Sequence, residues 1–305
     1  REAEARTKQI LEQFYQKTQG EITRSFLSRM ITRLESEQSV KEYLDIMDHR
    51  KTEQLIDTLD KVEQNRKECY IREFSIEHFH DSKVFETLIP KICKIFREEN
   101  EELTGFENEE ILAEYQIYKT PGYVYMKGNV QIYSAGKQAA DISAFPEGIA
   151  VAVGSEEDVP DICPDQTIDK VFTIENLTSF YRFKQEHSLV IYLGGYHDRS
   201  RRNLLMQIYQ KLPDAQYYHF GDLDAGGFYI LEHLKRKTGI PFQMFQMDIE
   251  TLKKYEDYAK PLTENDKKRL MQLEKMELPD EERKLITYML QKGIKLEQEC
   301  ISESQ

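Results

Sequence analysis

The sequence lacks the features that mark membrane, secreted and zinc-binding proteins. No stretch of its 305 residues approaches the roughly 18–20 consecutive apolar residues that a membrane-spanning helix requires. The first residues are charged and contain no apolar segment, which is not typical of a secretory signal. The few cysteines are far apart and form no CxxC pair: Cys69, Cys93, Cys163 and Cys300. We therefore expect a cytoplasmic protein with reduced thiols and no membrane partner.

Positive charge is also scarce. The chain has 42 Lys and Arg against 55 Asp and Glu, which gives a formal net charge of −13. This balance argues against a polybasic, histone-like binder of nucleic acid. It does not exclude a nuclease whose acidic residues hold a metal ion. A hydrophobic share of 39% is enough for a buried core, and the length predicts about two domains.

The first half predicts an α+β region that begins with a helical arm. In residues 1–67, apolar residues recur at three- and four-residue steps, as in an arm of two or three amphipathic helices. Its charged face is either a solvated surface or a coiled-coil partner surface. Residues 68–160 then predict a mixed domain, built from the following segments: a strand at 69–79, a helix at 82–99, a short helix or strand at 109–118, a β-hairpin of 123–126 with 130–133, and further strand within 141–153.

The second half predicts an α/β domain over residues 168–305. An acidic, proline-containing segment at 155–167 precedes it, and we place a domain boundary there. Short apolar strands alternate with helices, which indicates right-handed βαβ units and a Rossmann-like parallel sheet. The predicted strands are 170–174, 189–193, 216–220 and 242–247, and the helices between them are 177–186, 199–211 and 226–237. From 249 to 300 the chain is again predicted to be helical.

Three consecutive predicted strands end in residues suited to a ligand site. Glu175 follows the first, Gly194-Gly195 the second, and Asp222 and Asp224 the third. Ligands bind at the carboxyl ends of parallel strands. Asp222 and Asp224 are two residues apart in an extended segment, so their carboxylates point to the same side while Leu223 turns toward the core.

Three carboxylates at one sheet edge predict a site for Mg²⁺ or Mn²⁺, because these ions prefer oxygen ligands and bind substrate phosphates. Each residue also has a simpler interpretation. Asp224 can be the N-cap of the next helix, Asp222 can cap a turn, and Glu175 can be a solvated strand end. Their register on consecutive strands favours the metal site.

A basic segment follows the glycine pair. Arg199, Arg201 and Arg202 lie near the predicted metal site at the start of a helix, where arginines can bind phosphate. The alternative is a solvated helix start. No base-reading motif is present, so we expect DNA binding through phosphates and shape, with strong salt dependence.

The order strand–Glu, strand–GlyGly, strand–Asp-x-Asp resembles the Toprim domain of topoisomerases, primases and related nucleases. The strings Thr173-Ile174-Glu175-Asn176 and Phe220-Gly221-Asp222-Leu223-Asp224 are similar to the JetD family, the nuclease subunits of Wadjet plasmid-defence systems. Leu296-Glu297-Gln298-Glu299 resembles a terminal Glu-Gln-Glu string of that family. JetD is in turn related to the A subunit of type IIB topoisomerases.

The resemblance implies a Toprim fold for the C-terminal domain and metal-dependent cleavage of double-stranded DNA. It implies that Glu175 is a metal ligand or general acid/base, that Asp222 and Asp224 hold Mg²⁺, and that Glu297 and Glu299 complete a second metal position. The alternative for the last two is a charged final helical turn.

The resemblance also implies SMC- and kleisin-type Wadjet subunits as partners, and a homodimer. Three other functions stay open: a tyrosine-dependent, topoisomerase-VI-like DNA cleaver, a catalytically silent scaffold, and a metal-dependent phosphohydrolase acting on nucleotides. No motif singles out a nucleophile among the 18 tyrosines, so activated water is favoured.

Overall fold

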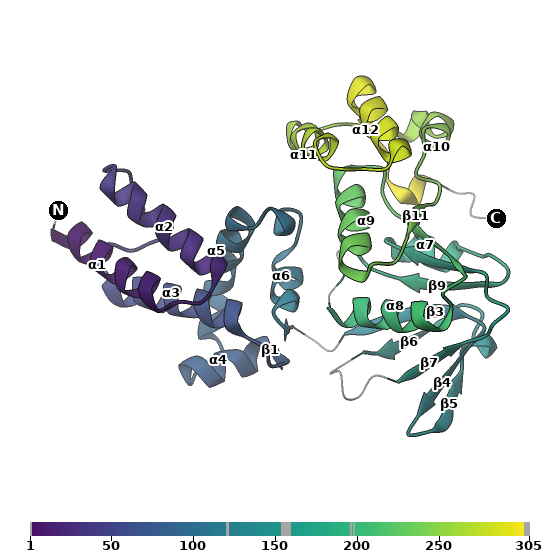
Figure 1. Ribbon diagram of the computed structural model, residues 1–305, viewed down its shortest axis with the longest axis horizontal. Helices are drawn as coiled ribbons and strands as arrows, with labels where there is room; N and C mark the ends of the chain where they lie inside the picture. The colour runs from purple at the N-terminus through teal and green to yellow at the C-terminus, as the bar shows by residue number, and fades with distance from the viewer. Residues whose placement is uncertain (1, 120–121, 154–159, 196, 198, 302–305) are drawn as a thin grey trace. The chain divides into compact units, whose positions relative to one another are not determined.

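The chain forms two compact units, Arg1–Thr120 and Pro121–Gln305. The computed structural model describes residues 2–119, 122–153, 160–195, 197 and 199–301 (Figure 1). The sequence placed a boundary within 155–167, and 155–159 of that segment lie outside the described residues. Strand β7 (Asp161–Pro164), which lies within that segment, pairs with β4 (Val130–Ser134), so the segment folds together with the strands that precede it. This pairing explains why the division falls near residue 120 instead.

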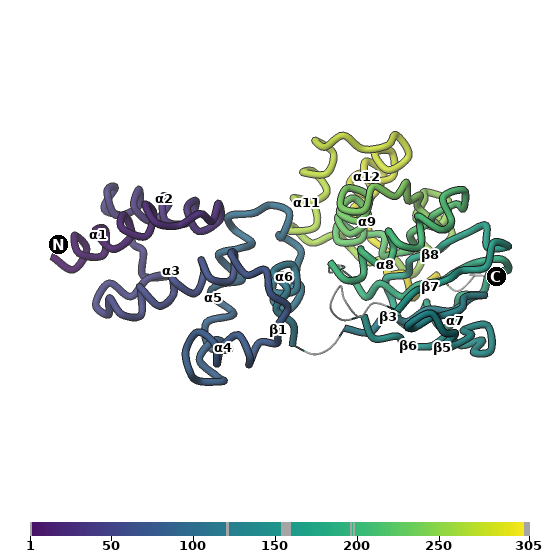
Figure 2. Tube along the Cα trace, turned by 60° about the horizontal axis from the view of Figure 1, so that its bottom comes forward, coloured from purple at the N-terminus to yellow at the C-terminus, as the bar shows by residue number. Residues whose placement is uncertain are grey.

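The first unit begins with three helices where the sequence predicts a helical arm. Helices α1 (Glu2–Lys17), α2 (Glu21–Glu35) and α3 (His49–Gln64) pack against one another (Figures 1 and 2). Leu11, Phe26 and Leu59, one from each helix, are fully buried, so these helices share a core. The rest of the unit consists of β1 (Cys69–Tyr70), α4 (Ile71–Phe79), α5 (Val84–Glu99), η1 (Glu101–Leu103), α6 (Asn108–Glu114) and β2 (Ile117–Tyr118).

The predicted strand at 69–79 is wrong. Only Cys69 and Tyr70 are extended, where β1 pairs in parallel with β2, and α4 follows at once. The buried residues of α4 include Ile71 and Phe74, whose spacing of three places them on one helix face. Glu73 Oε2 accepts a hydrogen bond from Tyr70 N at 2.8 Å and so supports the start of the helix. Aromatic and β-branched residues in this segment favoured a strand in the sequence analysis. Only a few apolar residues follow the three- and four-residue spacing that indicates a helix.

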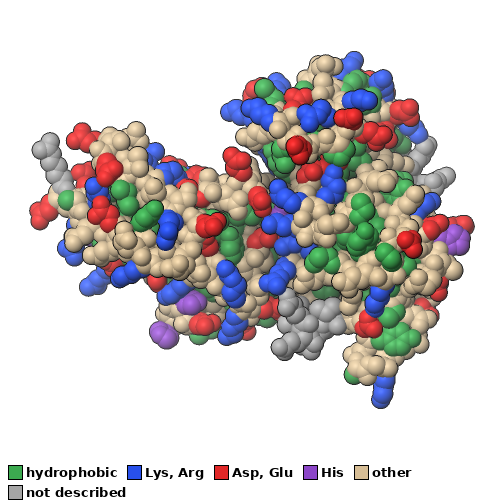
Figure 3. Space-filling view, viewed as in Figure 1, with side chains coloured by type: hydrophobic (Ala, Val, Ile, Leu, Met, Phe, Trp, Pro, Cys, Tyr) green, Lys and Arg blue, Asp and Glu red, His purple; other side chains and the backbone are tan. Residues whose placement is uncertain are grey.

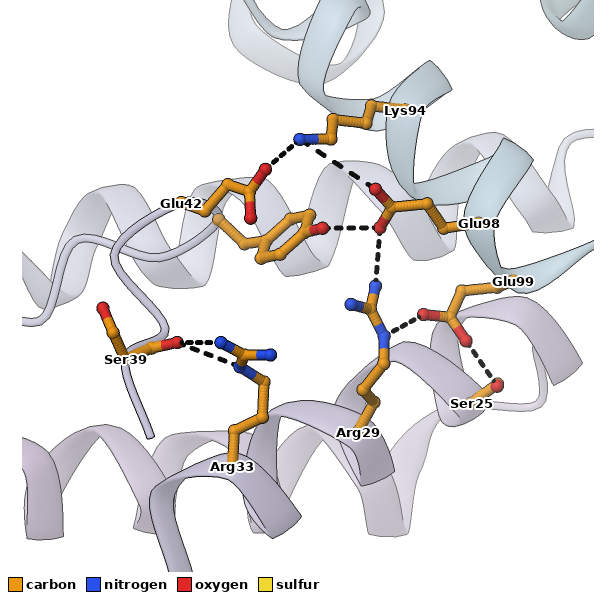
Figure 4. A network of polar contacts seen from close by, with 9 residues as sticks. Ser25, Arg29, Arg33, Ser39, Glu42, Lys94, Glu98 and Glu99 are labelled. Atoms are coloured by element: carbon orange, nitrogen blue, oxygen red, sulfur yellow. Dashed lines mark hydrogen bonds and ion pairs between the residues drawn. The ribbon is translucent and has the colours of Figure 1, made fainter. Parts of the chain in front are cut away.

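A polar network joins α2 to α5. Arg29 of α2 lies between two glutamates of α5, with 2.9 Å from its Nη2 to Glu98 Oε2, and its Nε donates to Glu99 (Figure 4). Tyr43 lies over the same arginine, with its ring centroid 4.9 Å from the guanidinium carbon, and donates its hydroxyl to Glu98. On the face of this unit drawn in Figure 3, acidic and basic side chains are interspersed. This pattern is typical of a solvated, ion-paired surface.

The second unit is built on a six-stranded mixed sheet. Its strand order is β11-β10-β8-β9-β3-β6. The first four strands are parallel, as the sequence predicts, whereas β3 runs antiparallel to both β9 and β6. The strand bounds are β3 (Tyr123–Gly128), β6 (Ile149–Ala152), β8 (Lys170–Ile174), β9 (Ser188–Tyr192), β10 (Gln216–Phe220) and β11 (Gln243–Met244). The domain is therefore mixed α/β, and a purely parallel sheet is not found.

The predicted hairpin of 123–126 with 130–133 is also wrong. Strand β3 pairs with β9 and β6, while β4 joins a separate three-stranded sheet of order β5-β4-β7, with β5 at Lys137–Asp141. Gly128 explains the separation. It has a φ of +142°, and a Cβ at this position would lie 2.6 Å from Ser188 O. Gly128 therefore lets β3 lie close to β9, and the chain then turns away from β3 into β4.

Helices pack around the main sheet and share one core with it. The core includes Phe172 of β8, Phe220 of β10 and Phe228 of α9, together with Leu270 and Ile286 from the C-terminal helices. Within the described ranges, no helix combines the length and apolar composition needed to cross a bilayer. The remaining elements are η2 (Ile142–Ala144), α7 (Leu177–Arg182), α8 (Arg199–Lys211), α9 (Ala225–Thr238), α10 (Ile249–Lys254), η3 (Glu256–Tyr258), β12 (Lys260–Pro261), α11 (Glu264–Glu274), α12 (Asp280–Lys292), β13 (Ile294–Lys295) and η4 (Gln298–Cys300).

Candidate metal and nucleic-acid site

Glu175 and Asp222 meet at the carboxyl ends of two adjacent parallel strands. In the register of β8 and β10, Ile174 lies opposite Phe220, so the residues just beyond them are neighbours. Glu175 N donates to Phe220 O at 3.0 Å, and Asp222 N donates to Glu175 Oε2 at 3.2 Å. The position predicted from strand order therefore brings these two acidic residues into direct contact.

Gly221 leaves the space that this contact needs. A Cβ on Gly221 would lie 2.6 Å from Glu175 Oε2 and 2.8 Å from His219 Nε2, both closer than carbon can approach without displacement. The glutamate carboxylate and the histidine ring thus converge over the glycine. Any larger residue at 221 would push one of them away.

His219 is a polar residue of this site that the sequence reasoning missed. It is fully buried, and its Nδ1 lies 2.9 Å from Thr173 Oγ1. Burial lowers the pKa of the imidazole to about 3, so the ring is neutral at physiological pH. Its position two residues before Gly221, on the face shared by Thr173 and Glu175, was the available signal.

The two aspartates of the Asp-x-Asp string have different local roles. Leu223 is fully buried between them, as predicted, and forms a β-bridge with Leu296. Asp224 caps helix α9, since its Oδ1 accepts from Gly227 N at 2.8 Å. The capping interpretation is therefore correct for Asp224. The capping bond uses only one of the two oxygens of the Asp224 carboxylate.

The C-terminal string lies across the ends of both strands. Leu223 and Leu296 exchange two backbone hydrogen bonds, of 2.9 and 3.1 Å. Gln298 N donates to Asp222 Oδ1 at 2.7 Å, and Asn176 Nδ2 donates to Glu299 Oε1 at 2.7 Å. Residues separated by more than 70 positions in the sequence are thus joined at one edge of the sheet.

The electrostatics of this edge are unfavourable without a cation. Burial raises the pKa of Asp222 to about 6, the backbone N–H of Gln298 opposes that rise, and the nearby charges of Asp224, Glu299 and Glu297 add to it. Lys260 Nζ lies 2.6 Å from Glu297 Oε1 and neutralises part of the charge. The carboxylates therefore lie near enough to one another to repel.

The donor set fits Mg²⁺ or Mn²⁺ by its chemistry. All the candidates offer hard carboxylate oxygens, and such ions commonly take only one or two carboxylates and keep several waters. In the described part of the chain, no three His, Cys, Asp or Glu side chains come together as a group that could hold a metal ion. Glu175, Asp222 and Asp224 would hold an ion partly through water, and Glu297 and Glu299 lie on the string beside them.

The arginines after the glycine pair divide into outward and inward residues. Gly194 and Gly195 have φ of +73° and +88°, a backbone conformation that glycine adopts readily and that lets the chain turn tightly after β9. Arg199 is exposed at the start of α8, but Arg202 is buried and donates to His197 O at 2.8 Å. The guanidinium of Arg202 is thus directed to His197 O in this structure, and its contact with DNA stays a prediction. Arg201 Nη2 lies 3.5 Å from Tyr123 O.

Comparison with known proteins identifies a family for the C-terminal part of the chain. Residues 157–305, which include every one of the candidate residues, match the family model described as Wadjet protein JetD, C-terminal. Residues 157–305 thus belong to the JetD family. Wadjet protein JetD of Bacillus cereus (strain Q1) is 28% identical over 263 residues, which is 85% of this chain and 63% of that relative. The chain therefore spans about 63% of the length of the JetD protein that it matches.

Proposed function

We propose that this chain is a metal-dependent DNA endonuclease with a Toprim-type C-terminal domain. It would cleave duplex plasmid DNA as the nuclease subunit of an SMC-like Wadjet defence complex in the cytoplasm. Glu175, Asp222 and Asp224 would bind Mg²⁺ or Mn²⁺, and Glu297 and Glu299 would extend the acidic site. The bound ion would stabilise charge on the attacked phosphate.

One observation carries this proposal. Glu175 and Asp222, on adjacent parallel strands, contact each other at the strand ends, and the C-terminal Glu-Gln-Glu string is bonded to the same edge. A scaffold needs no buried carboxylate at this edge. Burial of Asp222 and the nearby charges of Asp224, Glu299 and Glu297 make its ionised form unfavourable, and a bound cation would offset this cost.

Supercoiled plasmid is the direct test. The protein is incubated with Mg²⁺, Mn²⁺ or EDTA, and nicked and linear products are measured for wild type, Glu175→Gln and Asp222→Asn. We expect metal-dependent cleavage that falls by about 100-fold or more in both variants, since a metal ion supplies several kcal/mol of charge stabilisation. Glu264→Gln, at an exposed residue of α11, is the matched control and should cleave like wild type.

Partners enter the same experiment. A chain with a net charge of −13 should bind free DNA poorly alone, so Wadjet SMC and kleisin subunits are added in a second arm. Cleavage in neither arm, with any of the metals, would support the scaffold function instead. A homodimer would place two such sites on one duplex, and sedimentation of the active complex measures this.

A tyrosine-dependent mechanism has one observation in its favour. Tyr192 ends strand β9 opposite Ile174, and its phenol is near enough to Glu175 and Arg201 to feel their charges. Burial raises its pKa, however, which disfavours the phenolate that an attack requires. A tyrosyl–DNA adduct trapped by denaturation, and lost in Tyr192→Phe, would replace hydrolysis as the mechanism.

A further inference from the structure

Gln298 has an unusual environment for a glutamine. It is fully buried, whereas Glu297 and Glu299 on either side of it are partly or fully exposed. Burying an amide without partners costs roughly 1–3 kcal/mol, so such a residue normally makes a complete set of hydrogen bonds. Both polar atoms of the Gln298 side chain have a partner, one at the end of each strand that leads to an acidic residue.

The side chain of Gln298 continues the sheet beyond its last backbone pair. Glu175 N donating to Phe220 O is the final bond between β8 and β10. Beyond it, Asn176 N donates to Gln298 Oε1 at 3.0 Å, and Gln298 Nε2 donates to the same Phe220 O at 2.9 Å. A side-chain amide has the C=O and N–H groups of a peptide, so it bridges the two strands where their own ladder stops.

These bonds flank the acidic residues on both sides. Asn176 directly follows Glu175, Phe220 lies two residues before Asp222, and the main-chain N–H of Gln298 binds the Asp222 carboxylate. The amide therefore fixes the spacing between the backbone segments from which Glu175 and Asp222 project. A shift of either segment would break one of its bonds.

The string does not need this amide to stay in place. Two backbone hydrogen bonds join Leu296 to Leu223, and both leucines are buried. Ile301 is buried on the other side of Gln298. The side chain of Gln298 thus adds spacing control to a segment that is already anchored.

We propose that Gln298 is a positioning residue that sets the distance and orientation of Glu175 and Asp222 for a divalent cation. The inference rests on the proposed function, but it concerns metal binding and can be measured without cleavage. Groups that orient metal ligands typically change metal affinity or activity by about 10–100-fold when they are removed.

The test compares wild type with Gln298→Met in the full chain. Methionine keeps the length and volume but makes neither strand contact. Free Mn²⁺ is measured by electron paramagnetic resonance, and plasmid cleavage gives kcat and KM. We expect the Mn²⁺ Kd to rise about 10–100-fold, and kcat to fall with little change in KM for DNA. Gln291→Met, at an exposed residue of α12, is the matched control and should behave like wild type.

Three results would decide the matter. Unchanged Mn²⁺ affinity and unchanged kcat in a folded Gln298→Met protein would overturn the proposal, even if the protein were less stable. Mn²⁺ binding that weakens in a chain that cleaves no DNA would uphold the positioning role and reject only the nuclease. Wild type that binds no Mn²⁺ would overturn both. If Gln298→Met does not fold, Gln298→Asn, whose shorter amide cannot reach both strands, is held to the same outcomes.

Discussion

Replacing Asp222 with Asn should stabilise the protein in the absence of metal. Burial and the neighbouring carboxylates raise the pKa of Asp222 to about 6, from an ordinary value of 3.8. The two values differ by about 2, and each pKa unit corresponds to about 1.4 kcal/mol, so the ionised carboxylate destabilises the folded state by about 3 kcal/mol at neutral pH. Asparagine removes the charge and keeps the oxygen that accepts from Gln298 N–H. We expect a gain of about 1–3 kcal/mol.

The sign of the pH dependence follows from the same values. Between pH 3.8 and about 6, the folded protein holds a proton on Asp222 that the unfolded chain has lost. The contribution of this group to stability therefore falls as pH rises through that window, and it stays low above pH 6. Asp222→Asn removes this fall, so the difference between variant and wild type should be small near pH 4 and largest above pH 6.

Urea unfolding in EDTA, followed by pulse proteolysis, is the appropriate assay. The cleavage fragments show whether residues 1–120 or 121–305 have unfolded, which matters because the two units need not unfold together. Asp214→Asn, at an exposed aspartate of the same unit, should change stability by less than about 0.5 kcal/mol. An equal or lower midpoint for Asp222→Asn at pH 7.5 would refute the reasoning. Mn²⁺ at 100 times its Kd should then raise wild-type stability by about 2.7 kcal/mol, and raise the variant less.

Three further predictions concern other parts of the chain. Glu63→Gln should destabilise the first unit by about 2 kcal/mol in urea unfolding, because the Glu63 carboxylate accepts two backbone N–H groups in the first turn of α2, at 2.7 and 2.9 Å. Mn²⁺ affinity should stay unchanged, and an unchanged unfolding midpoint would contradict the prediction. Gly221→Ala should displace the Glu175 carboxylate and lower cleavage about 10-fold or more, and wild-type cleavage would show that the crowding is relieved elsewhere. Combined Arg199→Gln and Arg201→Gln should lower the slope of log K against log salt by up to about 2 in DNA-binding titrations; wild-type binding that is insensitive between roughly 50 and 200 mM salt would reject phosphate contacts altogether.

The sequence predicted the chemical edge of the sheet better than its surroundings. Strands β8, β9 and β10 end within two residues of Glu175, the glycine pair and Asp222, as the sequence predicts. Local sequence cannot reveal that β3 comes from before the acidic segment and pairs antiparallel with β9. Tertiary packing decides which strands pair when they are far apart in the chain. For the same reason, the predicted hairpin is wrong.

The interior residues of the site were missed for a related reason. Gln298 and His219 look like ordinary polar residues in the sequence, and their importance comes from burial that only the fold provides. Arg202 is a further case: the sequence groups it with Arg199 and Arg201, whereas the fold buries it against His197 O. Residues that act through burial are invisible to motif spacing when the partner lies many positions away.

The C-terminal string adds acidic residues to this edge of the sheet. It brings Glu297 and Glu299 beside Asp222, where their charges raise the pKa of that carboxyl further. Neutral residues at positions 297 and 299 would remove this repulsion, but they would also lose the contacts of Glu297 with Lys260 and of Glu299 with the amide of Asn176. The proposed cation would offset this repulsion and would also tighten the attachment of the string. Metal binding and docking of the C-terminal string should therefore be thermodynamically linked, with each strengthening the other.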